Sequence, residues 1–84
     1  MTAQEVKDYL VDNGCDGAIV YDDYPDAFLG HTPQGCAVYD YNKMVEALME
    51  QGESEEDARD WIDYNIIGAH LGDMTPVIVF PVTT

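Results

Sequence analysis

The fold is decided by residues 40–66, which read DYNKMVEALMEQGESEEDARDWIDYNI. Apolar side chains recur at helical spacing after Asp40, a residue type that caps helix starts, and Gly52 ends this run. A second run begins at Ser54, where Ser-Glu-Glu-Asp resembles a capping box and places acids where the helix dipole favours them. Two capped amphipathic runs on either side of one glycine predict a helical hairpin.

Each helix of this hairpin is expected to bury one face. The positions concerned repeat every three to four residues, which places them on one side of a helix. Because Trp61 and Leu48 belong to the two facing stripes, we expect the indole of Trp61 to be largely buried beside Leu48. The expected inward positions are Tyr41, Met44, Val45, Leu48 and Met49 on the first helix and Ala58, Trp61, Ile62, Asn65 and Ile66 on the second.

A shorter helix precedes the hairpin, over about residues 3–13. Thr2 and Glu5 have the spacing of a capping box, in which each side chain accepts the backbone N–H of the other residue. Gly14 then supplies the residue type that ends many helices. This part of the chain is therefore expected to add a third helix to the two of the hairpin.

Short apolar runs outside the helices predict a small sheet. Residues 32–35 read TPQG and are expected to join two of these runs as a hairpin. The last run is followed by Pro81, which places it at an edge of the sheet or ends it there. The predicted fold class is α+β, an antiparallel or mixed sheet of about four strands packed by three helices, in the order α-β-β-β-α-α-β. The expected strands are residues 18–21, 27–31, 36–39 and 77–80.

Length and composition favour a single domain over residues 1–84. A chain of 84 residues, 46% of them apolar, closes one core and has no length for a second. Cys15 and Cys36 form no CxxC pattern and follow no secretion signal, so we expect two buried reduced thiols. No apolar run approaches the roughly 18 residues that a membrane span needs. A cytoplasmic protein without a membrane partner is therefore expected.

The charge of the chain is strongly one-sided. There are 17 Asp and Glu residues against 3 Lys and Arg residues, which gives a formal charge of −14. A surface of one sign repels nucleic acid and anionic membranes, and it attracts basic surfaces at high rates. The sequence thus predicts a basic protein as the partner and argues against direct binding of nucleic acid.

The sequence carries no motif of catalysis or metal binding. Its seven glycines are scattered at the ends of elements and form no phosphate-binding loop. His31 and His70 are the only histidines, and neither accompanies a GxSxG motif or a catalytic cysteine pattern. Asp22, Asp23 and Asp26 lack the residue order of an EF-hand calcium loop. We therefore expect a binding protein and not an enzyme, with no catalytic residue, cofactor or metal.

Carboxylates recur along the polar sides of the predicted hairpin as two acidic ridges. Side chains one helical turn apart are separated by about 5–6 Å, which is comparable with the spacing of phosphates along a nucleic-acid strand. The ridges could therefore imitate a phosphate backbone, or they could only keep a solvated face soluble. The candidate partner-binding residues are Glu46, Glu50 and Glu53 on the first helix, Glu56, Asp60 and Asp63 on the second, and Asp22, Asp23 and Asp26 as a separate patch.

Four segments resemble parts of small acidic proteins that are encoded by bacterial phages and other mobile elements: YPDAFLG at 24–30, AVYDY at 37–41, KMVE at 43–46 and DYN at 63–65. In size and charge the chain is also similar to anti-CRISPR proteins and other DNA-mimic inhibitors. The resemblance implies an inhibitor that blocks the nucleic-acid-binding surface of a host defence protein, such as a CRISPR effector, in the host cytosol. The alternatives are an immunity or antitoxin-type protein that neutralises a basic toxin, or a housekeeping interaction domain.

Overall fold

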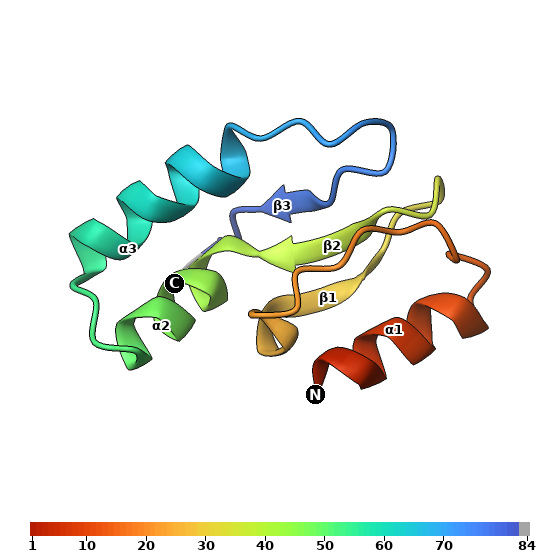
Figure 1. Ribbon diagram of the computed structural model, residues 1–84, viewed down its shortest axis with the longest axis horizontal. Helices are drawn as coiled ribbons and strands as arrows, with labels where there is room; N and C mark the ends of the chain where they lie inside the picture. The colour runs from red at the N-terminus through yellow and green to blue at the C-terminus, as the bar shows by residue number, and fades with distance from the viewer. Residues whose placement is uncertain (83–84) are drawn as a thin grey trace.

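Residues 1–82 are described by a computed structural model, and they form three α-helices and a three-stranded mixed sheet (Figure 1). A 3-10 helix over Pro25–Ala27 precedes the first strand, and a π-helical turn over Asp63–Ile67 follows the third helix. The predicted α+β class is confirmed, in the order α-β-β-α-α-β. The elements are α1 (Ala3–Asp12), β1 (Phe28–His31), β2 (Ala37–Asp40), α2 (Tyr41–Glu50), α3 (Glu55–Ile62) and β3 (Val77–Val79).

The sheet has the strand order β1-β2-β3 and combines both kinds of pairing. β1 and β2 form the predicted antiparallel hairpin, with His31 opposite Ala37. β2 and β3 run parallel, with Val38 opposite Val77, because the chain passes through α2 and α3 before it returns to the sheet. β3 lies at the edge of the sheet and ends before Pro81, as the proline indicated.

The strand predicted at residues 18–21 is wrong, because this segment is a link outside the sheet. The backbone N–H of Tyr21 donates to the hydroxyl oxygen of Tyr39 at 3.0 Å, so a side chain takes the place of a neighbouring strand. All four residues of the segment are half-buried. Strand propensity reports how well side chains fit such a surface, and it does not supply a pairing partner. The sheet therefore has three strands where four were expected.

The three α-helices begin at the caps that the sequence indicated. At α1, Thr2 Oγ1 accepts the N–H of Glu5 at 3.2 Å, and Glu5 Oε1 accepts the N–H of Thr2 at 2.8 Å, which completes the capping box. The carboxylate of Asp40 accepts an N–H of α2 at 3.2 Å, and the hydroxyl of Ser54 accepts one of α3 at 3.1 Å. These local bonds fix where the helices of the hairpin start.

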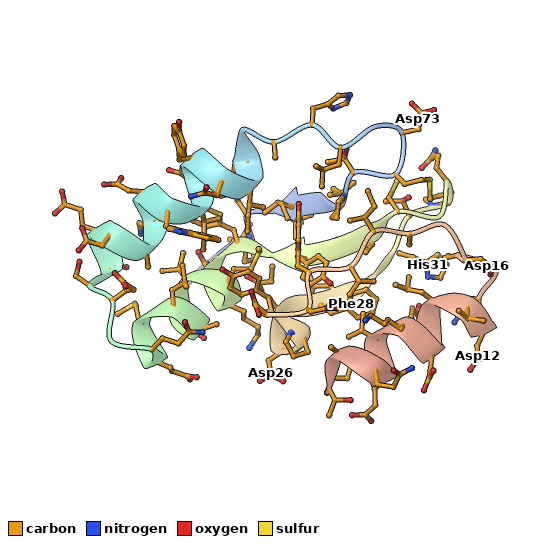
Figure 2. All side chains as sticks on the ribbon, in the orientation of Figure 1. Asp12, Asp16, Asp26, Phe28, His31 and Asp73 are labelled. Carbon is orange, nitrogen blue, oxygen red and sulfur yellow. The ribbon has the colours of Figure 1, made fainter. Side chains whose placement is uncertain are left out.

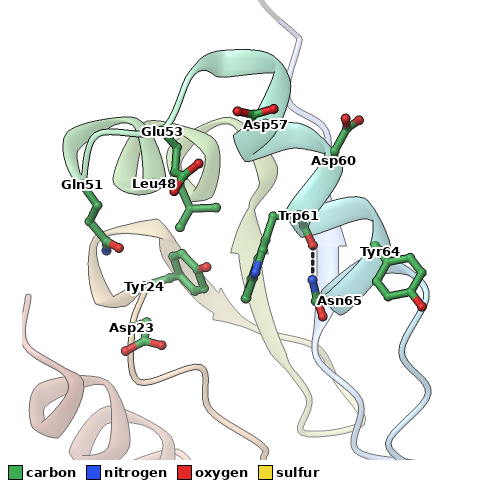
Figure 3. A pocket seen from close by; sticks show the side chains of 10 residues that line it. All are labelled: Asp23, Tyr24, Leu48, Gln51, Glu53, Asp57, Asp60, Trp61, Tyr64 and Asn65. Atoms are coloured by element: carbon green, nitrogen blue, oxygen red, sulfur yellow. Dashed lines mark hydrogen bonds between the residues drawn. The ribbon is translucent and has the colours of Figure 1, made fainter.

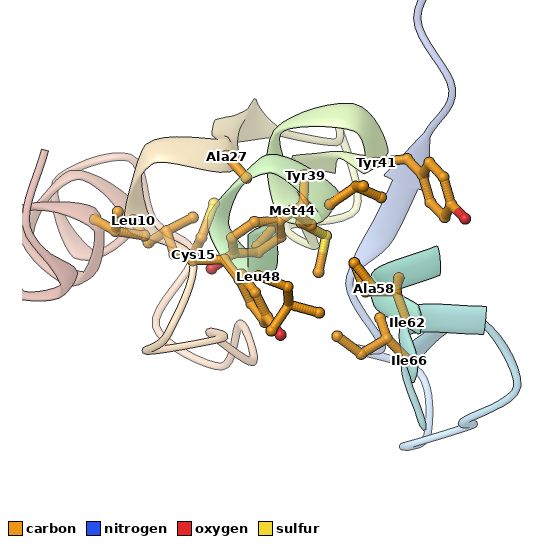
Figure 4. Packing of buried hydrophobic residues seen from close by; sticks show 14 residues of the cluster. Leu10, Cys15, Ala27, Tyr39, Tyr41, Met44, Leu48, Ala58, Ile62 and Ile66 are labelled. Atoms are coloured by element: carbon orange, nitrogen blue, oxygen red, sulfur yellow. The ribbon is translucent and has the colours of Figure 1, made fainter. Parts of the chain in front are cut away.

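The core is one cluster that extends from α1 to α3 (Figure 4). Leu10 of α1 lies at one end of it and Ile62 of α3 at the other, with Met44 of α2 between them. Each of these three side chains is buried almost completely. Cys15 and Cys36 are buried and free, which confirms the expected thiols. Since α1 and α3 lie toward opposite ends of the long axis, the hairpin occupies one end of the molecule.

Aromatic packing holds α1 to the sheet. Phe28 and His31 of β1 lie beside α1 (Figure 2), and the ring centre of Tyr9 is 5.6 Å from the ring centre of each. The hydroxyl of Tyr9 also forms a hydrogen bond with Nδ1 of His31 at 2.9 Å. His31 is thus a surface residue tied to α1, far from the hairpin helix α3.

The expected burial of Trp61 is wrong. Trp61 is 47% exposed, whereas Leu48 is 9% exposed and buried as predicted. Asn65 and Met49, which were assigned to the same two stripes, are exposed as well. α3 packs against α2 through a single buried row, so the neighbouring row with Trp61 remains at the surface. The row that enters the core consists of Ala58, Ile62 and Ile66.

Candidate functional site

A groove of about 660 Å³ lies between α3, the end of α2 and the link that precedes β1 (Figure 3). The buried side chains of Tyr24 and Leu48 form its floor. Its volume is within the range of ligand pockets, about 300–1,000 Å³. The residues that line it are Asp23, Tyr24, Leu48, Gln51, Glu53, Asp57, Asp60, Trp61, Tyr64 and Asn65.

One wall of the groove comes from α3 and the turn after it. Five lining residues have the spacing i, i+3, i+4, i+7 and i+8, which places them on one helix face beside the buried row. Asn65 Nδ2 donates to the carbonyl oxygen of Trp61 at 2.9 Å, a bond that joins the π-helical turn to α3 (Figure 3). We name this wall the open face of α3; it consists of Asp57, Asp60, Trp61, Tyr64 and Asn65.

The end of α2 places a further carboxylate at the groove. The N–H of Gly52 donates to the carbonyl of Met49 at 3.0 Å, and the N–H of Glu53 donates to that of Leu48 at 3.2 Å, which is a Schellman motif. Gly52 has a φ of +103°, a backbone conformation that favours glycine. The motif that reverses the chain between the two helices therefore also fixes the position of Glu53.

The lining of the groove carries negative charge and no positive charge. Among the lining residues in the described part of the chain there is no lysine, arginine or histidine. A cation is attracted to such a hollow, and an anion is repelled from it. The carboxylates of the groove belong to Asp23, Glu53, Asp57 and Asp60.

The patch predicted from Asp22, Asp23 and Asp26 is divided. Lys7 Nζ lies 3.1 Å from an oxygen of Asp22, and the amino terminus lies 3.3 Å from an oxygen of Asp26. These two acids therefore have cations of the same chain beside them. Asp23 alone of the three lines the groove.

The predicted ridges are divided as well. Glu53 and Asp60 line the groove. Glu46 and Glu50 line a separate hollow of about 230 Å³, together with Asp26 and a lysine, Lys43. Glu46 and Glu50 are thus part of a surface of mixed charge. Glu56 is exposed on α3 and lines neither hollow.

Asp63 is turned away from its ridge, because its carboxylate accepts the hydroxyl of Tyr41 at 2.9 Å. Phe80 stacks on the Tyr41 ring with the ring centres 4.4 Å apart. The guanidinium of Arg59 lies 5.7 Å from the centre of the same ring and 3.2 Å from an oxygen of Glu55. We name these five residues the closed face of α3, since a cation of the chain already occupies it.

The pKa of Tyr41 follows from this environment. Burial raises it most, and the hydrogen bond to Asp63 raises it further, whereas the charge of Arg59 lowers it. On the floor of the groove, burial raises the pKa of Tyr24 and the charge of Asp23 adds to the effect. Both hydroxyls are therefore protonated at neutral pH, and that of Tyr41 donates to Asp63.

Of the ten lining residues, only Asp23, Glu53 and Asp60 belong to the predicted binding set, and the seven others include Asp57, Trp61 and Tyr64. Sequence reasoning assigns Trp61 to the core, and it counts Asp57 as part of a helix start. The signal that identifies them is the spacing of acids and aromatic rings on one helix face. The groove residues and the buried residues form adjacent rows on the helix. Their spacing alone does not tell the two rows apart, so the buried row of α3 must be known first.

A search of protein-family models, of curated proteins and of solved structures finds no match for this chain. No helix within residues 1–82 is long and apolar enough to cross a membrane. Over the same residues, His, Cys, Asp and Glu side chains form no group of three that could hold a metal ion. The groove is therefore the feature of the molecule that bears on its function.

Proposed function

We propose that this protein is an acidic inhibitor that binds the basic, nucleic-acid-binding surface of another protein. The observation that carries the proposal is the groove, whose described lining combines four carboxylates with a half-exposed Trp61 and has no cation. A basic partner would supply the positive charge that this lining lacks. The formal charge of −14 would attract such a partner over a longer range.

The acids of α3 support competition with nucleic acid. Asp57 and Asp60 lie about one helical turn apart, which separates their side chains by about 5–6 Å. Phosphates along a nucleic-acid strand have a comparable spacing, and the Lys and Arg side chains that bind phosphates also bind carboxylates. A host defence protein such as a CRISPR effector holds its guide–target duplex in a positively charged channel, which is a surface of this kind.

The lining of the groove is suited to binding a cationic group. It offers carboxylates, amides, aromatic rings and one leucine, and the described lining has no serine, cysteine or lysine nucleophile and no histidine base. The hydroxyl of Tyr24 can donate a hydrogen bond to a bound group. We therefore propose a binding role that needs no catalytic residue, cofactor or metal.

Capture and competition test the proposal. The immobilised protein is exposed to an extract of its natural host, and each captured protein is purified and titrated with DNA or RNA in the presence and absence of this chain. We expect a captured protein with a nucleic-acid-binding surface. Its nucleic acid should be displaced by this chain, with an affinity that falls steeply as salt is added.

Variants of matched charge locate the contact. Asp57→Lys/Asp60→Lys should abolish the displacement of nucleic acid. Asp12→Lys/Asp16→Lys changes the net charge equally at the far end of the molecule, and it should retain the displacement (Figure 2). A captured basic protein that binds no nucleic acid would contradict the mimic and would fit an immunity or antitoxin-type role.

A further inference from the structure

We infer that the groove accepts one arginine side chain of the basic partner, with the guanidinium stacked on the indole of Trp61 and donating to the surrounding carboxylates. The inference rests on the proposed function and names the residue of the partner that enters the groove. Three observations carry it: the exposed indole, the charges around it, and a second site of the same chemistry on α3.

The indole of Trp61 is placed to receive a flat group. It projects into the groove between α3 and Tyr24 (Figure 3). A large aromatic side chain that is half exposed in a hollow is typical of an interface anchor. Guanidinium is planar and weakly hydrated and stacks on aromatic faces, whereas the ammonium of lysine is a strongly hydrated point charge.

The carboxylates around the ring match the donors of arginine. They reach the groove from three different elements, namely Asp57 and Asp60 from α3, Glu53 from the end of α2 and Asp23 from the link before β1. A guanidinium has five N–H donors in a fixed fork and can bind carboxylates through two parallel bonds. The apolar stem of the arginine would meet the floor of the groove at Tyr24 and Leu48.

On the closed face, a guanidinium of the same chain already lies beside an aromatic ring and a carboxylate. There the guanidinium of Arg59 lies 5.7 Å from the centre of the Tyr41 ring and 3.2 Å from an oxygen of Glu55. A ring and a carboxylate at α3 therefore already hold a guanidinium. The open face repeats the ring and the carboxylates without a cation in its described lining. The complementary guanidinium is therefore expected from a partner.

Fluorescence tests the inference directly, because Trp61 is the one tryptophan of the chain. The protein is titrated with hexa-arginine and with hexa-lysine, two peptides of equal charge, while the emission of Trp61 is recorded. We expect a saturable change with hexa-arginine and an affinity about threefold to tenfold above that of hexa-lysine, since stacking adds to charge attraction. Equal affinities, or an emission that does not change, would overturn the inference.

Matched variants separate the groove from net charge. Asp57→Asn/Asp60→Asn should weaken binding of hexa-arginine about tenfold or more, because it removes two charged acceptors. Asp12→Asn/Asp16→Asn removes the same charge far from the groove and should weaken binding less than about twofold in physiological salt. Equal losses in the two double variants would mean that the peptide senses only net charge, and the inference would be wrong.

The contribution of the ring is tested at constant charge. Trp61→Leu, followed by the anisotropy of a labelled peptide, should bind hexa-arginine no better than hexa-lysine. Circular dichroism verifies that the variant is folded, and the comparison of the two peptides on the parent protein stands without it. A Trp61→Leu protein that keeps the preference for arginine would show that the indole does not stack on the guanidinium.

Experiments with the captured partner distinguish a failure of the arginine inference from a failure of the proposed competition with nucleic acid. If Trp61→Leu displaces nucleic acid from the partner as well as the parent does, the mimic holds and the arginine inference fails. If the parent prefers hexa-arginine but its partner binds no nucleic acid, the arginine inference holds and the mimic fails.

Discussion

The two faces of α3 use similar side chains and differ in the source of the cation. On the closed face, Arg59 of the same chain lies over the Tyr41 ring and beside Glu55. On the open face, Trp61 stands among carboxylates, and the described lining contains no cation. The difference shows that one helix can hold some of its carboxylates beside a cation of the same chain and leave others in a groove whose described lining has no cation.

The charged side chains of the two faces carry little of the stability of α3. The side chains of Arg59 and Glu55 are 46% and 61% exposed, so water screens their attraction. The helix is held mainly by its buried row, in which Ala58 and Ile62 are fully buried. The open face can therefore be altered without unfolding the protein, and this separation is open to test.

The largest expected effect is on the buried row. Ile62→Ala should lower the free energy of unfolding by about 2–5 kcal/mol, because it leaves a cavity in a closed core. Trp61→Ala should lower it by only about 1–2 kcal/mol, below the about 3–5 kcal/mol of a buried aromatic residue. Urea denaturation of both variants measures the difference. Equal losses would place the indole in the core and remove the distinction between the rows.

A cation supplied within the chain should convert the open face into a second closed face. Asn65→Arg places a guanidinium four residues from Trp61, within reach of the indole on the same helix face. We expect the affinity for hexa-arginine to fall about tenfold, because the site is then occupied from within. Asp12→Asn makes the same change in net charge and is the control. An unchanged affinity of Asn65→Arg would contradict the assignment of the groove.

Features that depend on neighbours in sequence could be predicted from the sequence. The caps at Thr2, Asp40 and Ser54 are bonds within one turn, and the helices begin where these residues indicated. The glycine at position 52 ends α2 for the same local reason. The α+β class follows from these helices together with the short apolar runs.

Features that depend on tertiary contacts could not be predicted in the same way. The segment 18–21 has the composition of a strand, yet the N–H of Tyr21 donates to the side-chain hydroxyl of Tyr39 and not to a neighbouring strand. Trp61 has the spacing of a core residue, but α3 packs against α2 through only one buried row. Asp63 does not continue the predicted acidic ridge of α3, because its carboxylate accepts a hydrogen bond from the hydroxyl of Tyr41. The groove could therefore be predicted only by someone who already knew these three tertiary features.

A change on the closed face should have a moderate effect that depends on pH. Tyr41→Phe removes the hydrogen bond to Asp63 and should lower the free energy of unfolding by about 1 kcal/mol at neutral pH. Tyr64→Phe on the open face is the control, and its effect should stay within about 0.5 kcal/mol. Urea denaturation at neutral pH measures both. A larger loss for Tyr64→Phe would reverse the roles of the two faces.

The pH dependence has a definite sign. Burial raises the pKa of Tyr41 above its ordinary value of 10.0, so the folded protein holds this proton more tightly than the unfolded chain does. The stabilisation is therefore fully present below about pH 10 and is lost as the pH rises through the raised pKa. The parent should lose stability between neutral pH and about pH 11, and Tyr41→Phe should lose less. A larger loss in the variant would contradict the raised pKa.

The smallest expected effect is the dependence of stability on salt, and it compares the two faces directly. Added salt weakens the attraction between Arg59 and Glu55 on the closed face, and it relieves repulsion among acids that outnumber Lys and Arg by 17 to 3. The repulsion involves more groups, so we expect a net gain of about 0.5–1 kcal/mol in the free energy of unfolding as NaCl rises to about 0.5 M.

Two variants separate the effect of salt on the Arg59–Glu55 attraction from its effect on the repulsion among acids. Glu55→Gln/Arg59→Gln keeps the formal charge at −14 but removes the attraction, so its gain in stability with salt should exceed that of the parent. Asp57→Asn/Asp60→Asn brings the formal charge from −14 to −12, since it removes two negative charges, and its gain should be smaller. Urea midpoints at low and high salt give all three gains. The reverse order of the two variants would mean that the acids of the open face do not repel one another strongly, and the attraction of the groove for a cation would then lose its physical basis.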